Sequence, residues 1–229
     1  MILKIKTFIK GVGCYTKQFY EIIIGIATLI TSIATILLMV NQNKLQEEAN
    51  IINAATLSPC FHISQAKIDY DGNGIKDTEI LTVNNIGANL KAPTNIEISV
   101  YYKVKKCTPK TDITLTIPIV GYYFAQFHTE QLYGELTSAY LLNNWSKYID
   151  FEQAIHSYSK GDIFYFVNKV DVIKIEYIDI LGMSHKSYYQ NNSLITDEVY
   201  YKIKKDATDT SYDVDKIDAD EIIKLLDTI

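Results

Sequence analysis

The chain has 229 residues, of which 48% are hydrophobic, 21% are charged and 12% are aromatic. This composition is typical of a folded globular chain, so it excludes a disordered or collagen-like protein. The formal net charge of −5 excludes a global basic field that would attract nucleic acid. All 22 cationic side chains are lysines, which disfavours sites that grip carboxylates or phosphates with the two-pronged guanidinium of arginine.

The most informative segment for location is residues 22–40, "IIIGIATLITSIATILLMV", which contains no charge. A helix of this length spans a hydrocarbon core of about 30 Å. Four hydroxyl residues interrupt the apolar letters, but each can bond to a carbonyl of its own helix. The run also exceeds the roughly 7–15 apolar residues of a cleavable signal peptide. We therefore predict a single transmembrane helix that stays attached, with the lipid bilayer as its partner.

The flanks of this segment predict its orientation. Lysines are retained on the cytoplasmic side of a membrane helix. Residues 1–21 are therefore expected to form a cytoplasmic basic segment, and the C-terminal domain is expected outside the cell membrane. The lysines before the segment are Lys4, Lys6, Lys10 and Lys17.

Residues 41–57, "NQNKLQEEANIINAATL", are predicted to prolong the helix as a stalk. Leu45, Ala49 and Ile52 recur at helical spacing, and Pro59 ends the pattern. Such a stalk can act as a spacer or as a surface for another helix.

Residues 58–205 change to a period of two, which is typical of strands. In "TNIEISVYYKVKK" the side chains of Ile96, Ile98, Val100 and Tyr102 share one face. Similar segments, including 198–205, predict about seven short strands in an antiparallel β-sandwich. Before one of them, "TVNNIG" resembles the strand ends of immunoglobulin-like bacterial surface modules. The fold class is therefore expected to be mainly β, with an immunoglobulin-like, extracytoplasmic sandwich after the membrane helix.

Two parts of the exported region break the alternation. Between about residues 129 and 160, apolar residues recur at helical spacing, which predicts one or two short helices inserted between strands. This insertion either carries a binding surface or covers one end of the sandwich. Residues 206–229 are expected to form an acidic linker and a short C-terminal helix that begins at Asp218, which packs on the domain or meets a partner.

The stretch "DYDGNGIKD" resembles an EF-hand-type calcium loop and the shorter calcium loops of surface repeats. The resemblance implies calcium as a cofactor, with oxygen ligands from Asp69, Asp71, Asn73, the carbonyl of Ile75, and Asp77. The pattern departs from the EF-hand at its twelfth position, where Ile80 replaces the bidentate glutamate. The dipeptides Asp-Gly and Asn-Gly equally favour a plain hairpin turn. We predict a hairpin first and a calcium site on it second.

Cysteine and histidine positions limit the chemistry. Cys60 and Cys107 are both expected outside, where disulfides persist, and the sequence leaves open whether they pair or stay as thiols. The histidines lack metal-binding spacing, and no nucleophile elbow, P-loop or dinucleotide fingerprint occurs. We therefore predict that the protein is not an enzyme.

The chain has 18 tyrosines, and four Tyr-Tyr pairs are expected to place one ring in the core and one outside. Exposed tyrosines are effective contacts for proteins and glycans. The sequence thus predicts a single-pass, membrane-anchored, extracytoplasmic binding or assembly protein with a protein or glycan partner and no nucleic acid.

An alternative is a pilin-like subunit, which such a chain resembles in its apolar N-terminal helix, in Glu21 and in its β-rich head. However, Thr16 stands where pilin processing requires glycine. An accessory component of a membrane-associated secretion or phage-related complex is a further alternative.

Overall fold

The computed structural model describes residues 2–124 and 128–228, with side chains described for 19–50, 52, 57–124 and 130–228. Its contacts divide the chain into two compact units, Met1–Ala55 and Thr56–Ile229. We call the second unit the head domain. Each unit is described by itself below.

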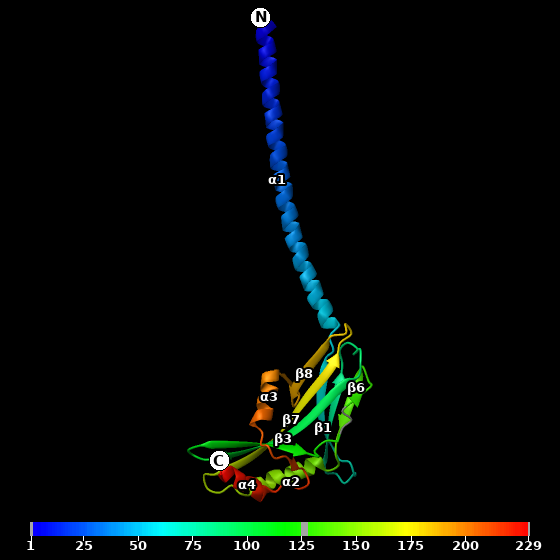
Figure 1. The fold of residues 1–229 in the computed structure, drawn as a ribbon, viewed down its shortest axis with the longest axis vertical. Helices are drawn as coiled ribbons and strands as arrows, with labels where there is room; N and C mark the ends of the chain where they lie inside the picture. The colour runs from blue at the N-terminus through cyan, green and yellow to red at the C-terminus, as the bar shows by residue number, and fades with distance from the viewer. Residues whose placement is uncertain (1, 125–127, 229) are drawn as a thin grey trace. The chain divides into compact units, whose positions relative to one another are not determined.

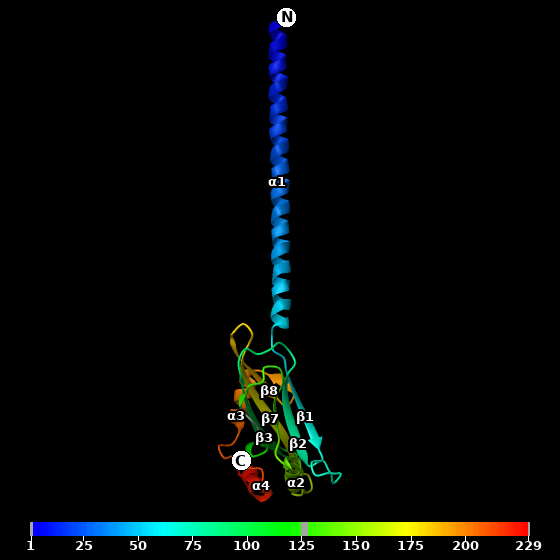
Figure 2. The ribbon, with the colours of Figure 1, turned by 90° about the vertical axis from the view of Figure 1, so that its right-hand side faces the viewer.

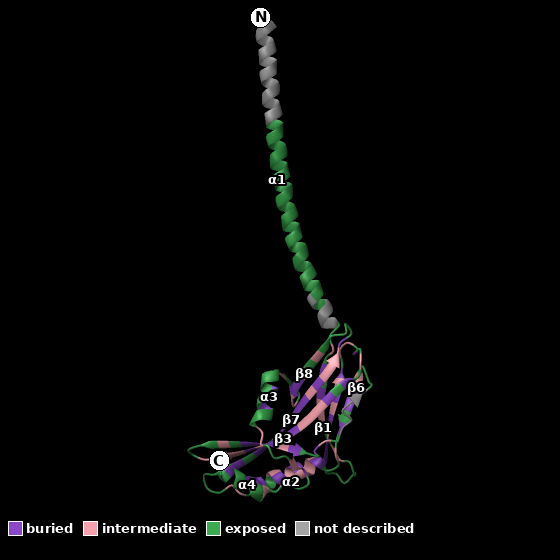
Figure 3. Ribbon diagram, viewed as in Figure 1, coloured by how far each residue is buried: buried purple, intermediate pink, exposed green. Residues whose placement is uncertain are grey.

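The first unit belongs to a long helix, α1 (Ile2–Thr56), which contains the predicted anchor and stalk without interruption. One part of it, Phe19–Asn50, is long and apolar enough to cross a membrane, and none of that segment is buried (Figure 3). Thr28 donates its hydroxyl proton to the carbonyl of Ile24 at 2.8 Å, and the other three hydroxyl residues do the same one turn back. The predicted back-bonding is therefore confirmed. The side chains of Cys14 and of the lysines before the anchor lie outside the described residues.

The head domain is mostly sheet, in two layers (Figures 1 and 2). A small antiparallel sheet has the order β1 (Phe61–Ile68), β2 (Thr78–Asn85), β6 (Gly134–Ala139). A large sheet has the order β10 (Tyr212–Asp213), β4 (Asp112–Val120), β3 (Thr94–Cys107), β7 (Phe164–Ile178), β8 (Ser184–Gln190), β9 (Ser193–Ile195), and β5 (His128–Thr129) also pairs with β3. Among the strands that the structure describes, β10 is the one that runs parallel to its neighbour, β4.

The predicted alternation of β3 is confirmed. Ile96, Val100 and Tyr102 are buried on one face of the large sheet, and Ile98 is partly buried beside them. The first half of that face packs against the small sheet through a shared apolar core. Its buried members are Phe61, Ile63, Leu81, Val83, Leu90, Ile96, Leu136, Ile173, Ile175 and Tyr189.

Two helices cover the other half of this face, α2 (Asn144–His156) and α4 (Ala219–Asp227). The predicted C-terminal helix is thus present, and its N-terminal cap is Asp218, as expected. The predicted insertion is helical only from residue 144. Its earlier part was wrongly assigned to helix, because residues 134–139 form β6 and complete the small sheet beside β2. Burial of Leu136 suits both patterns, so spacing alone did not separate them.

Residues 198–205 were predicted as a strand, and this prediction is wrong because they belong to the helix α3 (Asp197–Asp206). Thr196 caps it by accepting from the backbone N–H of Val199 at 3.4 Å. Acidic residues occupy its first turn and lysines its last turn, which suits the helix dipole. Tyr200 and Ile203, three residues apart, are buried against the outer face of the large sheet.

Because α3 covers that outer face, the expectation for the Tyr-Tyr pairs is also wrong for two of the strand pairs. Tyr101 and Tyr102 point to opposite faces of β3 and are both buried. The same holds for Tyr188 and Tyr189 on β8. The large sheet is thus a central layer, with apolar packing on both of its faces.

Candidate functional site

The loop of residues 69–77 joins β1 to β2 as an antiparallel hairpin, which confirms the predicted turn. The Asp69 carboxylate organises it by accepting from the backbone N–H groups of Gly72 at 2.7 Å, Asn73 at 3.1 Å and Gly74 at 2.6 Å. Both glycines have positive φ, 76° and 89°, which side chains rarely adopt. The hydrogen bond from Gly74 is the main cause that lowers the pKa of Asp69.

The other predicted calcium ligands stay within the same loop. Asn73 donates its side-chain amide proton to Asp71 at 2.9 Å, and Asp77 is buried at the base of the hairpin. The side chain of Ile75 is exposed. Within the part of the chain that the structure describes, no group of three His, Cys, Asp or Glu side chains is arranged to hold a metal ion. Calcium at this loop stays a prediction from the sequence.

The structure leaves both described cysteines as free thiols, so it does not join Cys60 to Cys107. Cys60 precedes β1, and its carbonyl accepts from the N–H of Ile86 at 2.8 Å, close to the segment that leads into β3. Cys107 is the last of the 14 residues of β3. A strand rises about 3.3 Å per residue, whereas disulfide Cα atoms lie within about 7 Å. The length of β3 therefore keeps the two thiols apart.

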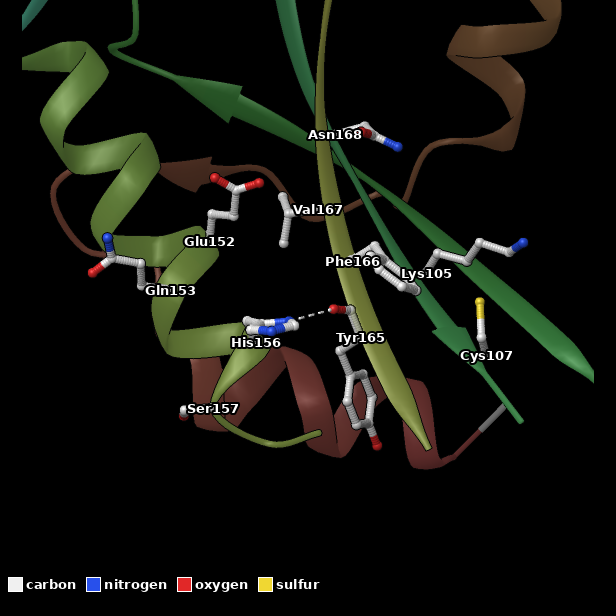
Figure 4. A pocket seen from close by; sticks show the side chains of 10 residues that line it. All are labelled: Lys105, Cys107, Glu152, Gln153, His156, Ser157, Tyr165, Phe166, Val167 and Asn168. Carbon is white, nitrogen blue, oxygen red and sulfur yellow. Dashed lines mark hydrogen bonds between the residues drawn. The ribbon is translucent and has the colours of Figure 1, made fainter. Parts of the chain in front are cut away.

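A cavity of about 780 Å³ opens between the end of α2, the edge of β7 and the end of β3 (Figure 4). We call it the α2 pocket. It exists because β8 pairs with β7 only from Val172 onward, which leaves the first half of β7 at the edge of the sheet. Side chains from α2 and from the segment after it cap that edge. Tyr148 donates its hydroxyl proton to the carbonyl of Val167 at 3.1 Å, and Ser159 accepts from the N–H of Tyr165 at 3.0 Å.

The lining of the α2 pocket combines aromatic, charged and thiol side chains. Phe166 offers an aromatic face that is 48% exposed, and Lys105 forms an ion pair with Asp112 at 2.6 Å that raises the pKa of the lysine. His156 projects from α2 and Cys107 from β3, on either side of β7 (Figure 4). The pocket residues therefore form no cysteine–histidine pair that could act as nucleophile and base.

A second feature, which the sequence analysis missed, is a buried group of charges between the two sheets. It consists of Glu79 on β2 with Lys169 and Asp171 on β7, and we call it the ion cluster. Their side chains are only 2%, 8% and 1% exposed. The Lys169 Nζ atom lies 2.6 Å from Glu79 Oε1 and 2.5 Å from Asp171 Oδ2.

Neighbouring polar groups hold the ion cluster in place. Tyr123 donates its hydroxyl proton to Glu79 Oε1, and Gln65 donates its amide proton to Asp171 Oδ2. The buried side chain of Asn144 accepts from the N–H of Glu79 at 2.7 Å and donates to the carbonyl of Glu79 at 2.9 Å. Glu79 is thus fixed at both its side chain and its backbone.

The electrostatics of the ion cluster are dominated by burial. Burial raises the pKa of Asp171, against the opposing charge of Lys169. Burial likewise raises the pKa of Tyr122 and of Tyr123, whose rings lie 4.7 Å and 5.2 Å from the Lys169 Nζ atom. Among the described residues, Asp171 Oδ1 is buried with no hydrogen-bond partner. Two carboxyl groups therefore share one ammonium group in a buried site.

The alternation of the strands held a signal for these residues. Ile173 and Ile175 of β7 face the core, and the same period places Lys169 and Asp171 on that face. A charged residue on a core face is an exception that requires a partner. The sequence does not say which strand supplies the partner, because the pairing of the sheets is long-range.

No protein-family model and no curated protein matches this chain. One solved structure that it is similar to is a Bordetella pertussis protein provisionally named ApaA, with 7% sequence identity and a TM-score of 0.14. The match covers 58% of this chain and 92% of that chain. A TM-score of this size supports no statement about a shared fold or function.

Proposed function

We propose that this protein is a single-pass, membrane-anchored binding or assembly protein whose head domain works outside the cytoplasm. The observation that supports this most is the apolar segment Phe19–Asn50 of α1, of which nothing is buried. Burial of one large aliphatic side chain away from water is favourable by about 1.5–3 kcal/mol. A bilayer supplies that burial along residues 22–40, the uncharged part of the segment.

The proposed orientation depends on charge. The lysines before the anchor favour a cytoplasmic N-terminus, because cationic residues are retained on that side. The exposed loop of residues 69–77 would then meet the outer medium, where millimolar calcium can fill even a weak site.

For the head domain we propose an immunoglobulin-like sandwich. Two sheets that share one apolar core support it, as do the antiparallel pairs β1–β2, β3–β4 and β7–β8. The helices α2 and α4 then cover one end of the large sheet.

The α2 pocket is the part of the head domain that we propose for the partner, a protein or a glycan. Its volume of about 780 Å³ falls in the range of about 300–1,000 Å³ that is usual for ligand pockets. Phe166 would supply the apolar contact there. The polar side chains of Glu152 and His156 on α2 would supply hydrogen bonds.

Labelling of native cysteines tests the anchor and its orientation. Variants of the full chain that retain only Cys60 or only Cys14 are treated in intact cells with a membrane-impermeant maleimide. We expect label on Cys60 in intact cells and on Cys14 only after lysis. The opposite pattern would overturn the orientation, and release of the chain by an alkaline carbonate wash would overturn the anchor.

Substitution in the α2 pocket tests the binding role. Full-length chain is applied to a defined glycan array, and the same chain fixed on beads is incubated with outer-surface protein fractions. Phe166→Ala is expected to lose the retained partner, whereas Phe164→Ala, which is equally exposed but does not line the pocket, should keep it. Equal retention by both variants would contradict the assignment of the pocket.

Assembly through α1 is the second candidate function, as in a pilin-like subunit or an accessory component of a secretion or phage-related complex. The observation that favours it is an exposed apolar stripe of Leu38, Leu45 and Ile52, which are seven residues apart. Leu45→Cys should form crosslinked dimers in membranes on oxidation, whereas the neighbouring Lys44→Cys, which is off the stripe, should not. Equal crosslinking at both positions would argue against a defined helix interface.

A further inference from the structure

The ion cluster brings together the parts of a condensation reaction. Lys169 carries a primary amine, Glu79 carries a carboxyl group at 2.6 Å from it, and Asp171 carries a second carboxyl group at 2.5 Å. All three side chains are buried. We propose that Lys169 and Glu79 are joined by an amide bond that forms within the folded head domain, with Asp171 as the group that relays the proton.

The environment favours the reactive forms of the groups. An ammonium ion has no lone pair, so Lys169 must first pass a proton to Glu79. The reaction therefore starts from the neutral amine and the neutral acid, and a buried site makes that proton transfer less costly than it is in water. The fixed approach of the two groups also replaces a collision in solution, which is worth a large effective concentration.

The bond changes balance without any further reactant. The Lys169 nitrogen attacks the Glu79 carboxyl carbon, and a C–N bond forms. Asp171 takes a second proton from the nitrogen and returns a proton to the departing hydroxyl, so that the C–O bond breaks and one water leaves. Asp171 ends in the state in which it began, and nothing is oxidised or reduced.

Glu79 is a better acceptor than Asp171 for three reasons. Its Oε1 atom accepts a hydrogen bond from the Tyr123 hydroxyl, which would stabilise the negative charge that develops on that oxygen. Its backbone is fixed by Asn144 on both sides. Asp171 stands two residues from Lys169 on the same strand, so a bond between these two would not join the sheets. The raised pKa of Asp171 also suits it to proton transfer.

The amide product also leaves fewer buried charges in the ion cluster than the ion pair does. The remaining amide N–H can donate to Asp171, and the amide oxygen can keep the hydrogen bond from Tyr123. Two of the three buried charges disappear, and buried charges are costly to keep. The bond would join β2 of the small sheet to β7 of the large sheet, across 90 residues of chain. It would thereby restrict the unfolded state as a disulfide does.

Intact mass tests the proposal on the full chain purified in detergent. We expect a mass that is lower than the sequence mass by one water, about 18 Da. After cleavage at lysines, peptide 77–91 should be found joined to peptide 161–174, with Lys169 uncut. The full sequence mass in a folded sample would overturn the proposal. A water loss confined to peptide 161–174 would overturn it too, because the bond would then join Lys169 to Asp171.

Matched variants separate the bond from the fold. Asp171→Asn retains the shape of the side chain, and we expect it to have the full sequence mass together with native circular dichroism. Lys169→Met should also have the full mass. Asp227→Asn, at an ion pair with Lys106 on the surface, should keep the water loss. Water loss in the Asp171→Asn variant would overturn the role of Asp171 in proton transfer.

Discussion

The loop of residues 69–77 and the ion cluster are both rich in carboxylates, but different groups stabilise the negative charge in each. In the loop, Asp69 accepts three backbone N–H groups from residues that are at most five positions away. In the ion cluster, Glu79 on β2 and Asp171 on β7 share an ammonium group, although the two strands are far apart in the sequence. One site is local and exposed, and the other is long-range and buried.

Exposure and burial determine how much each site depends on its charged partners. Exposed charges are hydrated and screened, so the loop gains little from a counter-ion unless a cation binds tightly. A buried charge without its partner is strongly destabilising. We therefore expect substitutions in the ion cluster to lower the free energy of unfolding of the head domain by more than substitutions in the loop.

The largest effect is expected for Lys169→Met, because it leaves two buried carboxyl groups without a cation. The free energy of unfolding should fall by about 3–5 kcal/mol. Urea unfolding followed by the fluorescence of Trp145, the single tryptophan, measures this in the head domain. Lys186→Met is the control, because that lysine pairs with Glu176 at the surface and should cost no more than about 1 kcal/mol. Equal losses would remove the distinction between buried and exposed pairs.

Asn144→Ala should have the next largest effect. Its side chain makes three hydrogen bonds to buried backbone groups, two on Glu79 and one on Tyr122. Leaving such groups unpaired lowers the free energy of unfolding by about 2–3 kcal/mol. The exposed Gln153→Ala on the same helix should change it by no more than about 0.5 kcal/mol. A neutral Asn144→Ala would show that the backbone of Glu79 needs no support from α2.

Calcium should produce a smaller effect, confined to the loop. At 10 mM calcium and a dissociation constant of about 1 mM, stabilisation would be about 1.4 kcal/mol, seen as a raised Tm. Asp71→Ala should abolish the rise, and Lys169→Met should keep it. A Tm that does not respond to calcium would leave the loop as a hairpin turn alone.

The smallest effects are expected from pH, and they have opposite signs in the two regions. The pKa of Asp171 is raised from 3.8, so its contribution to stability is fully present below that value and is lost as pH rises through the folded-state pKa. The pKa of Asp69 is lowered from 3.8, so its contribution is present above that value and is lost as pH falls.

Unfolding measured between about pH 3 and pH 8 tests these signs. Relative to the wild type, Asp171→Asn should gain stability as pH rises, and Asp69→Asn should lose it. Parallel curves for the two variants would contradict the assignment of opposite shifts.

The features that could be predicted from sequence are those set by near neighbours. The period of two placed Ile96, Val100 and Tyr102 on one face, and the glycines of the loop placed the hairpin. The helix α3 was missed because "EVYYKIKK" also alternates, although Thr196 and the charges at its ends favour a helix. In this segment the capping residue and the helix propensity therefore determined the structure, and the alternation did not.

The features that could not be predicted depend on which strands meet. Charged residues on the core faces of β2 and β7 were visible, but only the packing of the small sheet on the large one brings Glu79 to Lys169. The sequence left open whether Cys60 and Cys107 pair for a related reason, because the length of β3, rather than the compartment, sets the distance between them.

A double-substitution cycle tests most directly whether Glu79 and Lys169 act as one unit across the two sheets. Glu79→Met, Lys169→Met and the double variant are unfolded in urea with Trp145 fluorescence as the signal. We expect the double variant to be more stable than the sum of the single losses implies, by at least about 2 kcal/mol. If the losses in free energy of unfolding of the two single variants add to that of the double variant within about 0.5 kcal/mol, the claim that Glu79 and Lys169 act as one unit would be contradicted.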